Sequence, residues 1–280
     1  MGDVLTIRSL RSIDRLLLVL FLLLLAVVAV FPFYWLAVGS VMAPAELFAS
    51  VPRLWPSEAD FNTYRRIFDL VPLGRYFANS VIVSGTTTVV AVLVASAAGY
   101  CFARLTFFGQ GILFALILGA LMVPSQATMV PLFVMFANWN LLNSYPGIIL
   151  PGVVSAFGVF MMTQFFKSLP AELREAAIVD GASEYRIFAG IYLPLARPAV
   201  ATLALFVFMG TWDQLLWPMI VAPAPDMRTL QVGLAFIRQQ APVTNQVMAA
   251  IMVSVIPVVI AFLLTQKQFI AGIAAGAVKE

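Results

Sequence analysis

The chain has no histidine and a single cysteine, Cys101, among its 280 residues. Imidazole bases, His-ligated metals and Ser-His-Asp triads are therefore excluded, and so are an intrachain disulfide and a Cys-based zinc site. Charged residues make up only 10% of the chain, against about 25% in an average soluble domain. Hydrophobic residues make up 62%, and the mean hydropathy is +1.00. Most of this chain must therefore be surrounded by lipid. A net charge of +3 does not indicate the basic surface that binds nucleic acid.

Six stretches with very few charges are each long enough to cross a bilayer, which takes about 20 apolar residues in a helix. The sequence therefore predicts an all-α integral membrane protein. The first stretch exceeds the 7–15 apolar residues of a signal peptide, so it is expected to be retained. The predicted permease domain, 16–267, holds spans at about 16–40, 77–103, 109–136, 145–167, 198–221 and 245–267.

The placement of Lys and Arg predicts the orientation of these helices. With the N-terminus inside, ten basic residues fall in cytoplasmic segments and six in outer segments. We therefore expect residues 1–15 and the C-terminal tail, 268–280, to lie in the cytoplasm.

Proline occurs in five of the six predicted spans, where it removes a backbone donor and bends a helix. Proline is common in membrane helices, so simple packing irregularity is the favoured interpretation. The alternative is a set of bent helices around a translocation path. The residues are Pro32, Pro124, Pro131, Pro151, Pro218 and Pro257.

One cytoplasmic segment, the loop 168–197 with its flanking residues, is unusually rich in charge. Glu172 and Glu175 lie where they would favour a helix N-terminus, and Gly181 would end that helix. A second helical stretch follows as far as Pro194. A helix lying on lipid would carry mainly basic residues, whereas acids and bases are equal in number here. Small residues flanked by charge favour docking of a soluble partner instead.

The spacing of this segment is that of a known motif. Glu175-Ala176-Ala177-x3-Gly181-x9-Ile191-x-Leu193-Pro194 matches the EAA loop of permease subunits of binding-protein-dependent ABC importers. The chain from about 61 to 280 resembles the carbohydrate-uptake branch, and within it the second membrane subunit of maltose-type importers. Supporting segments are Asn79-Ser80, MVPSQATMVPLF at 122–133, GIILP at 147–151 and TWDQLLWP at 211–218. One departure is TWDQ at 211–214, where this branch more often carries Asn followed by Glu or Asp.

The resemblance implies an importer subunit of the bacterial cell membrane that takes up a sugar or sugar-like solute. Its implied partners are a second six-helix permease subunit, a cytoplasmic ABC ATPase dimer and an extracytoplasmic solute-binding protein. The chain has no G-x-x-x-x-G-K-[ST] motif, so ATP and Mg²⁺ are expected on the ATPase, with no cofactor on this chain and no enzymatic activity of its own.

The EAA loop is expected to couple ATPase closure to alternating access. We expect Gly181 to adopt a positive φ, so that Gly181→Val uncouples transport. The alternative is that the acidic residues only cap the helix or keep it soluble. The expected coupling residues are Glu175, Ala176, Ala177, Asp180, Gly181 and Ala182.

The most informative intramembrane residue is Asp213, because a carboxylate at mid-membrane costs about 2.5–3.5 kcal/mol. It either faces a path or a partner helix, or lies at the outer interface within an aromatic belt. The candidate solute-path residues are Asn79, Ser84, Gln126, Thr128, Trp212, Asp213 and Gln214.

Two outer loops and the tail carry further expectations. Residues 61–64 are expected to form an amphipathic segment that leads the chain to the membrane. By resemblance, the loop 222–243 is expected to reach the binding protein.

Residues 270–280 are expected to form a flexible tail. The resemblance places this tail against the ATPase, and the alternative is a frayed terminus without a function.

Two other functions remain as alternatives. The same mechanism fits an importer of glycerol phosphate or a glycerophosphodiester, although no Arg or Lys lies inside a span. A self-contained secondary transporter would show inverted repeats and several buried acids, which this sequence lacks.

Overall fold

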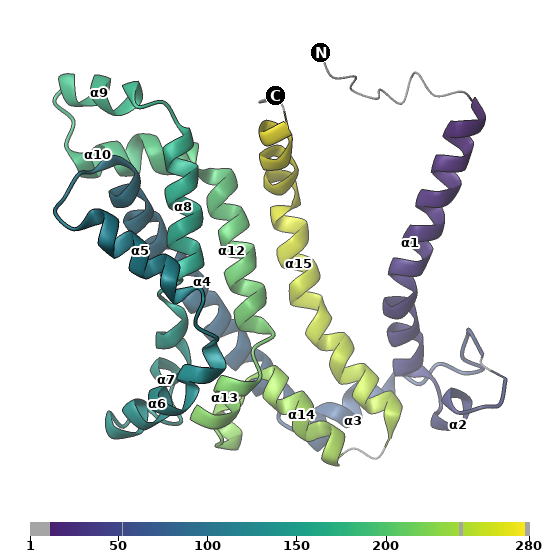
Figure 1. Cartoon of the computed structure of the whole chain (residues 1–280). Coiled ribbons are helices and arrows are strands. Elements are labelled where there is room, and N and C mark those ends of the chain that lie inside the picture. Colours follow the sequence, from purple (N-terminus) through teal and green to yellow (C-terminus); the bar gives the residue numbers. More distant parts are fainter. Residues whose placement is uncertain (1–11, 52, 241–242, 278–280) are drawn as a thin grey trace. The chain divides into compact units, whose positions relative to one another are not determined.

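The computed structural model describes residues 12–51, 53–240 and 243–277, and every regular element in these ranges is helical (Figure 1). The chain forms two compact units. One comprises residues 1–71 and 237–253, and the other residues 72–236 and 254–280. The first eleven residues of the predicted N-terminal segment lie outside the described residues.

The first unit contains one long apolar helix. In α1, no residue of the most apolar stretch is buried, as expected for a helix that faces lipid. The amphipathic segment predicted at 61–64 begins α3, which buries Thr63 and Ile67. Asn245 of α15 links that helix to the end of α1, because its side-chain amide donates a hydrogen bond to the carbonyl of Met42 over 2.9 Å. The elements are α1 (Ser12–Val41), α2 (Pro44–Leu47), α3 (Asn62–Leu70) and the first part of α15 (Thr244–Ala277).

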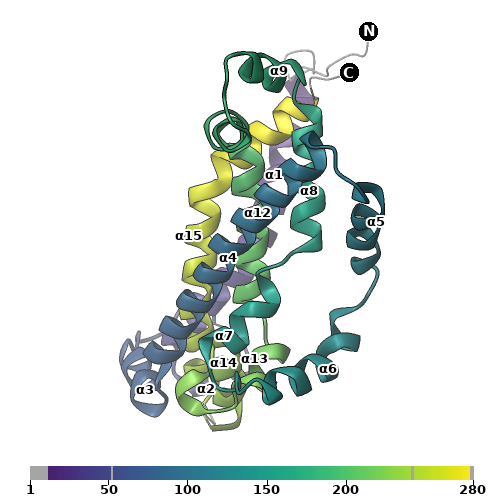
Figure 2. The same ribbon diagram turned by 90° about the vertical axis from the view of Figure 1, so that its left-hand side faces the viewer.

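The second unit is built on three helices, α4, α8 and α12, which Figures 1 and 2 show side by side. Small residues allow their close approach, as is usual between helices in membranes. A Cβ at Gly99 of α4 would lie 2.6 Å from the Cβ of Met162, and one at Gly158 would lie 3.0 Å from that of Ala95. The elements are α4 (Leu73–Arg104), α5 (Gln110–Ala120), α6 (Ser125–Asn138), α7 (Tyr145–Ile149), η2 (Leu150–Gly152), α8 (Ala156–Ser168), α9 (Glu172–Val179), α10 (Glu184–Ile187), η3 (Phe188–Tyr192), α11 (Leu193–Leu195), α12 (Arg197–Trp212), α13 (Leu216–Val221), η4 (Pro225–Met227) and the start of α14 (Leu230–Gln240).

Three of the predicted spans are interrupted rather than continuous. The chain bends by 101° between α5 and α6 and by 42° between η2 and α8, while α12 ends at Trp212 and α13 starts only at Leu216. Pro124 sits at the sharpest of these bends, where it disfavours a helical conformation of Val123 before it. The spans predicted over 109–136, 145–167 and 198–221 are therefore bent or interrupted rather than straight helices, and Pro124 and Pro151 lie at or beside two of the breaks.

By length and composition, three helices of the described chain are able to cross a membrane, or up to six if each bent pair is one span. The three long ones are α1, α4 and α15. The last of these continues as a helix to Ala277, so most of the residues predicted to form the C-terminal tail are helical. Residues 278–280 lie outside the described residues.

Candidate functional site: the coupling loop and the interrupted spans

The helix–Gly–helix segment forms a tight corner after α9. Gly181 has a φ of +76°, the left-handed conformation that favours glycine. Its N–H donates to the carbonyl of Ile178, and the N–H of Ala182 donates to that of Ala177, both over 2.9 Å. These two bonds make a Schellman C-cap, which ends α9 and turns the chain into α10. The positive φ expected for Gly181 is confirmed.

An ion pair closes this corner from within. Arg174 of α9 binds Glu184 of α10, with one contact from its Nε to Oε2 at 3.3 Å. The hydrogen bonds from Arg174 hold the pKa of the Glu184 carboxyl below its ordinary value. The hydroxyl of Tyr100, in α4, donates to the same Oε2 over 2.7 Å. The corner is thereby fixed both across its own two arms and to the end of α4.

A second residue of α4 holds the start of the loop. Arg104 donates from Nη2 to the carbonyl of Phe166, in the last turn of α8, over 2.6 Å, and also to the carbonyl of Leu169, which follows that helix. Its guanidinium also lies 5.2 Å from the ring centroid of Tyr192, in cation–π range. One helix end therefore positions both the entry and the return of the loop.

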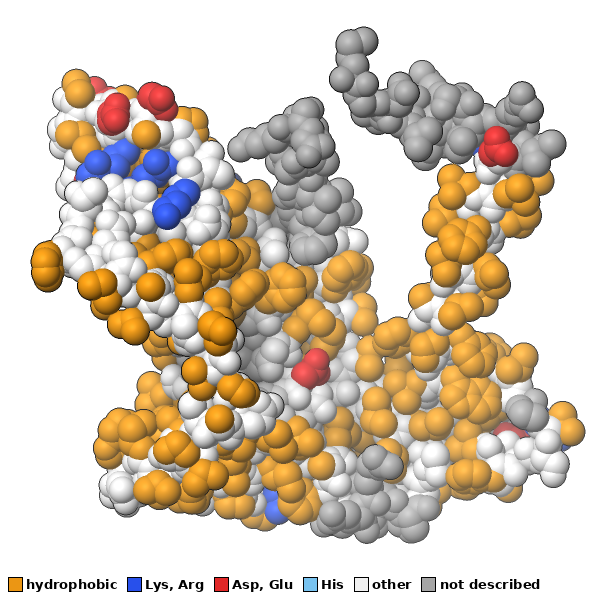
Figure 3. Space-filling model, in the orientation of Figure 1, with side chains coloured by type: hydrophobic (Ala, Val, Ile, Leu, Met, Phe, Trp, Pro, Cys, Tyr) orange, Lys and Arg blue, Asp and Glu red, His pale blue; other side chains and the backbone are white. Residues whose placement is uncertain are grey.

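The outward face of the loop combines acid and apolar side chains. Figure 3 shows acidic side chains over α9 and a band of basic side chains next to them, from α10 toward α8. Val179 is 87% exposed and lies directly before the exposed Asp180, and Tyr185 in α10 is 79% exposed. Exposed apolar groups of this size on a charged loop are typical of a docking surface. In the sequence, the feature that could have indicated this surface is the apolar pair Ile178-Val179, which stands directly before Asp180 in a charged loop.

The six expected coupling residues are thus divided by the fold. Glu175, Ala176, Asp180 and Gly181 are exposed on one corner. In contrast, Ala177 is only 7% exposed and belongs to the core against α4 and α8, and Ala182 is half-buried. The small side chain of Ala177 lets the corner lie close to α4 and α8. Of the six expected residues, the four exposed ones are therefore available to a partner protein.

Among the candidate solute-path residues, Asn79 lies in a hydrogen-bonded cluster at the opposite end of α4. It is 2% exposed, and its amide donates to the carbonyls of Asp226 and Arg228, both over 2.9 Å. Its Oδ1 accepts a hydrogen bond from the Tyr145 hydroxyl over 2.7 Å. Ser84 is also buried, and its hydroxyl donates to the carbonyl of Ser80 within α4. Asn79 therefore fastens the loop that follows α13 to α4 and α7.

The end of α12 and the segment after it carry three more of these candidates. Trp212 is buried, and its indole N–H donates to the carbonyl of Ser254 over 3.2 Å. Asp213 is exposed, and its carboxylate accepts a hydrogen bond from the Gln231 amide over 3.3 Å. Gln214 instead lines a hollow of about 220 Å³, together with Thr128. Of the seven candidates, only these last two share a cavity, and Gln126 is exposed beside it.

That hollow brings together several elements of the second unit. Ser125 and Thr128 come from the first turn of α6, Gly152 from the end of η2, Gln214 from the segment that links α12 to α13, and Trp217 from α13 itself. The Trp217 indole N–H donates to the carbonyl of Gly147 over 3.0 Å, which fixes the ring. Ser125 and Trp217 were not among the sequence candidates.

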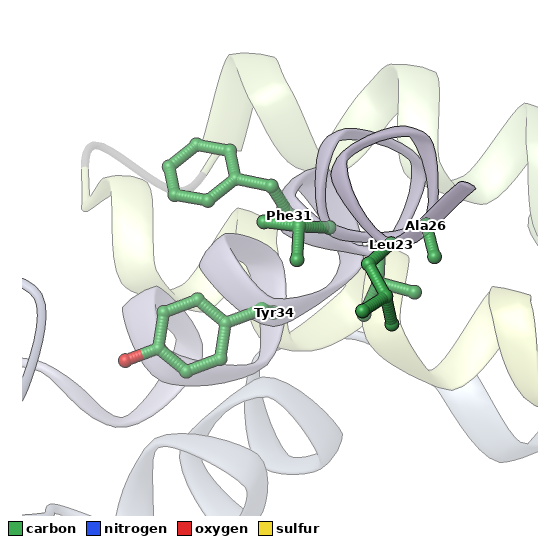
Figure 4. A pocket seen from close by; sticks show the side chains of 6 residues that line it. Leu23, Ala26, Phe31 and Tyr34 are labelled. Carbon is green, nitrogen blue, oxygen red and sulfur yellow. The ribbon is translucent and has the colours of Figure 1, made fainter. Parts of the chain in front are cut away.

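A larger hollow, of about 410 Å³, runs along the surface of α1 (Figure 4). Leu23, Ala26, Phe31 and Tyr34 lie along it, and all of its lining residues come from this single helix. Its lining is apolar except for the Tyr34 hydroxyl, which donates to the carbonyl of Leu54. Such a groove suits lipid chains rather than a hydrogen-bonding solute. Within the described residues, no group of three or more Cys, Asp or Glu is placed to hold a metal ion.

Comparison with known proteins agrees with this arrangement. An arabinooligosaccharide transport system permease protein of Bacillus subtilis strain 168 is 34% identical over 274 residues, which cover 96% of this chain and 97% of the relative. A diacetylchitobiose uptake system permease protein of Streptomyces coelicolor is 33% identical and covers 91% of this chain and 86% of its own. An sn-glycerol-3-phosphate transport system permease protein of Yersinia pestis is 33% identical, with coverage of 87% and 90%.

A solved structure has the same fold. It is the crystal structure of a bacterial ABC transporter involved in the import of the acidic polysaccharide alginate, and one of its chains matches with a TM-score of 0.79 and 26% identity, over 93% of this chain and 99% of that one. Residues 91–274 match the family described as binding-protein-dependent transport system inner membrane component. The chain therefore belongs to this family, as a multi-pass permease subunit of an ABC importer of the carbohydrate-uptake type.

Proposed function

We propose that this permease imports a neutral oligosaccharide that an external solute-binding protein delivers. A cytoplasmic ABC ATPase dimer would supply the energy, with ATP and Mg²⁺ held on that partner, and a second six-helix permease would complete the path. Both termini would lie in the cytoplasm, on the side of the coupling loop. Relatives named for arabinooligosaccharides and diacetylchitobiose support the substrate class.

The observation that carries the proposal is the corner formed by α9, Gly181 and α10. Its exposed Val179 is an apolar anchor within a charged rim, which is the usual arrangement of a protein interface. The ion pair of Arg174 with Glu184 and the bond from Tyr100 tie the corner to α4. A partner that moved this corner would therefore move α4 with it. Glu175 and Asp180 would set the register of docking by their charge.

Glycerol 3-phosphate is the second candidate substrate, because a glycerol-3-phosphate permease is 33% identical. A phosphate would require cationic partners in the path. No Lys or Arg lines the hollow at Gln214, and Asp213 beside it would repel an anion. A neutral sugar suits these side chains better.

Uptake by the reconstituted importer tests the proposal. The chain is placed in liposomes with its partner permease, ATPase and binding protein, and uptake of labelled arabinotriose, diacetylchitobiose, lactose and glycerol 3-phosphate is measured. We expect uptake of a sugar that depends on ATP and on the binding protein, and no uptake by this chain alone. Uptake by the purified chain without its partners would contradict the proposal, and uptake of glycerol 3-phosphate alone would select the second substrate.

A further inference from the structure

The hollow at Gln214 lies where three interruptions of the helical spans meet. Ser125 is the first residue of α6 after the 101° bend, and Gly152 is the last residue of η2 before the 42° bend. Gln214 lies in the gap between α12 and α13. Figures 1 and 2 both show α6, α7 and α13 side by side at this end of the second unit. Residues far apart in the sequence are therefore gathered at one place by the breaks themselves.

In many secondary transporters, the solute site is built from interrupted helices, and the same physical reasoning applies to a break in any membrane protein. A break frees backbone groups and polar side chains, and these are tolerated inside a membrane only where they line a wet cavity or are buried in protein. Ser125, Thr128 and Gln214 are all exposed here, in a chain whose surroundings are mostly lipid. Exposed hydrogen-bonding groups at such a position indicate a cavity that water and solute enter.

The lining also indicates what kind of solute fits. Two hydroxyls and one amide offer donors and acceptors without charge, and no Lys, Arg, Asp or Glu contributes to the wall. The Thr128 hydroxyl donates its hydrogen bond to the carbonyl of Ser125 over 3.0 Å, so its oxygen is available to accept a hydrogen bond from a solute. Among the described residues, no protein group is hydrogen-bonded to the Gln214 side-chain amide, so that amide is available to a solute.

The remaining wall is apolar and firmly held. Trp217 is fixed by its bond to Gly147, and Phe136 packs against it edge-on, with ring centroids 5.5 Å apart. This side is also lined by Met129, Leu132, Ile148 and Pro151. A sugar ring has hydroxyls at its edge and C–H groups on its faces, so it matches a wall of this kind. At about 220 Å³, the hollow is smaller than the roughly 300–1,000 Å³ of a site for a drug-sized ligand, which suits a single ring.

We infer that this hollow is a solute subsite of the permease, taking one uncharged, hydroxyl-rich ring of the transported molecule between Gln214, Thr128 and Trp217. The inference deepens the proposed function and rests on it. It means that this subunit contacts the solute directly, through residues brought together by broken helices.

Thiol protection in the complete importer tests the subsite. Cys101 is first replaced by Ser, and then single cysteines are introduced as Gln214→Cys, Thr128→Cys and, as a matched control, Gln126→Cys. Gln126 is exposed in the same first turn of α6 but does not line the hollow. The importer is assembled in nanodiscs, and the rate of modification by a small charged methanethiosulfonate is measured with lactose, diacetylchitobiose, arabinotriose or glycerol 3-phosphate present.

We expect at least one of the three sugars to slow modification at positions 128 and 214 by threefold or more, and to leave position 126 unchanged. Glycerol 3-phosphate should protect less than that sugar does. Protection by none of the sugars, equal protection at position 126, or stronger protection by glycerol 3-phosphate would each overturn the subsite. Uptake assays on the same preparations separate the two ideas: intact sugar uptake without protection removes the subsite alone, whereas absence of ATP-dependent uptake removes the proposed function.

Discussion

The hydroxyl of Tyr100 donates a hydrogen bond to the Glu184 carboxylate over 2.7 Å, and so joins α4 to the coupling loop. At its other end, the same helix holds the outer loop through Asn79, whose amide binds the carbonyls of Asp226 and Arg228. A helix of 32 residues spans about 48 Å at 1.5 Å per residue. One rigid element therefore contacts both the segment expected to meet the ATPase and the segment expected to meet the binding protein.

Tyr100→Phe is predicted to loosen the coupling loop without disturbing the core. The ring keeps its edge-on contacts with Phe166 and Tyr192, so only the bond to Glu184 is lost. A hydrogen bond to a charged group is worth about 1.5–3 kcal/mol when buried, and less here because Glu184 is partly exposed. We expect faster amide hydrogen exchange over residues 172–195 in the variant.

Tyr145→Phe is the matched control, because it removes a single hydroxyl bond, to Asn79, at the other end of α4. It should speed exchange in the outer loop 222–229 and leave 172–195 unchanged. Equal exchange over 172–195 in the wild type and in Tyr100→Phe would contradict the role assigned to Tyr100.

Substitutions at Gly181 should depend on backbone preference rather than on space. No atom lies within 4 Å of a Cβ built there, so a side chain meets no clash, but the φ of +76° disfavours a β-branched residue. Strain of this kind costs of order 1–3 kcal/mol. We expect Gly181→Val to lower sugar uptake about tenfold or more, as the sequence also predicts.

Gly181→Asn separates this strain from simple loss of glycine, because asparagine tolerates the left-handed region. This variant should keep most of the uptake. If valine and asparagine at position 181 behaved alike, the positive φ would not be what matters.

Val179→Asp is predicted to weaken binding of the ATPase. Burial of a valine side chain stabilises an interface by about 1.5–3 kcal/mol, which corresponds to roughly a 10- to 150-fold change in affinity. A carboxylate beside Asp180 would add repulsion between like charges. Co-purification of the ATPase with the solubilised permease measures the effect, and Val179→Ile, which keeps the apolar surface, should bind normally. Undiminished co-purification with the aspartate variant would remove Val179 from the interface.

The loop should also loosen in acid. The pKa of Glu184 is lowered in the folded protein by Arg174, from an ordinary value near 4.5. The stabilisation is therefore complete above that value and is lost as the pH falls through the lower folded pKa. We expect hydrogen exchange over residues 172–195, corrected for the intrinsic effect of pH, to increase below about pH 4.5. Glu184→Gln should show the looser loop already at pH 7 and little further change, whereas an identical pH response in both proteins would contradict the role of this carboxylate.

The coupling loop is the part of the site that spacing predicts well. Its signals are local, because Glu175 and Gly181 are six residues apart and both act through the turn of one helix. The burial of Ala177 was not predictable in this way, since it depends on packing against α4 and α8. The exposed Val179 next to it follows from the same packing.

Contacts between segments that are far apart along the chain could not be predicted from the sequence. Asn79 reads as a polar residue in a span, and its partners lie 147 and 149 residues away. The hollow at Gln214 likewise depends on three breaks that meet in space. Pro124 predicts one of these breaks, but nothing in the sequence indicates that Ser125, Gly152 and Gln214 come together.

The most direct measurement of the central claim is photo-cross-linking from the exposed corner of the coupling loop. A benzophenone amino acid replaces Val179 in the intact importer, and the same group at Val134 of α6, which is 51% exposed in another part of the fold, is the control. Illumination should link position 179, and not position 134, to the ATPase subunit, with higher yield when ATP closes the ATPase dimer. A transport-competent importer in which position 179 links to lipid or to nothing would contradict the assignment of this loop as the contact with the ATPase.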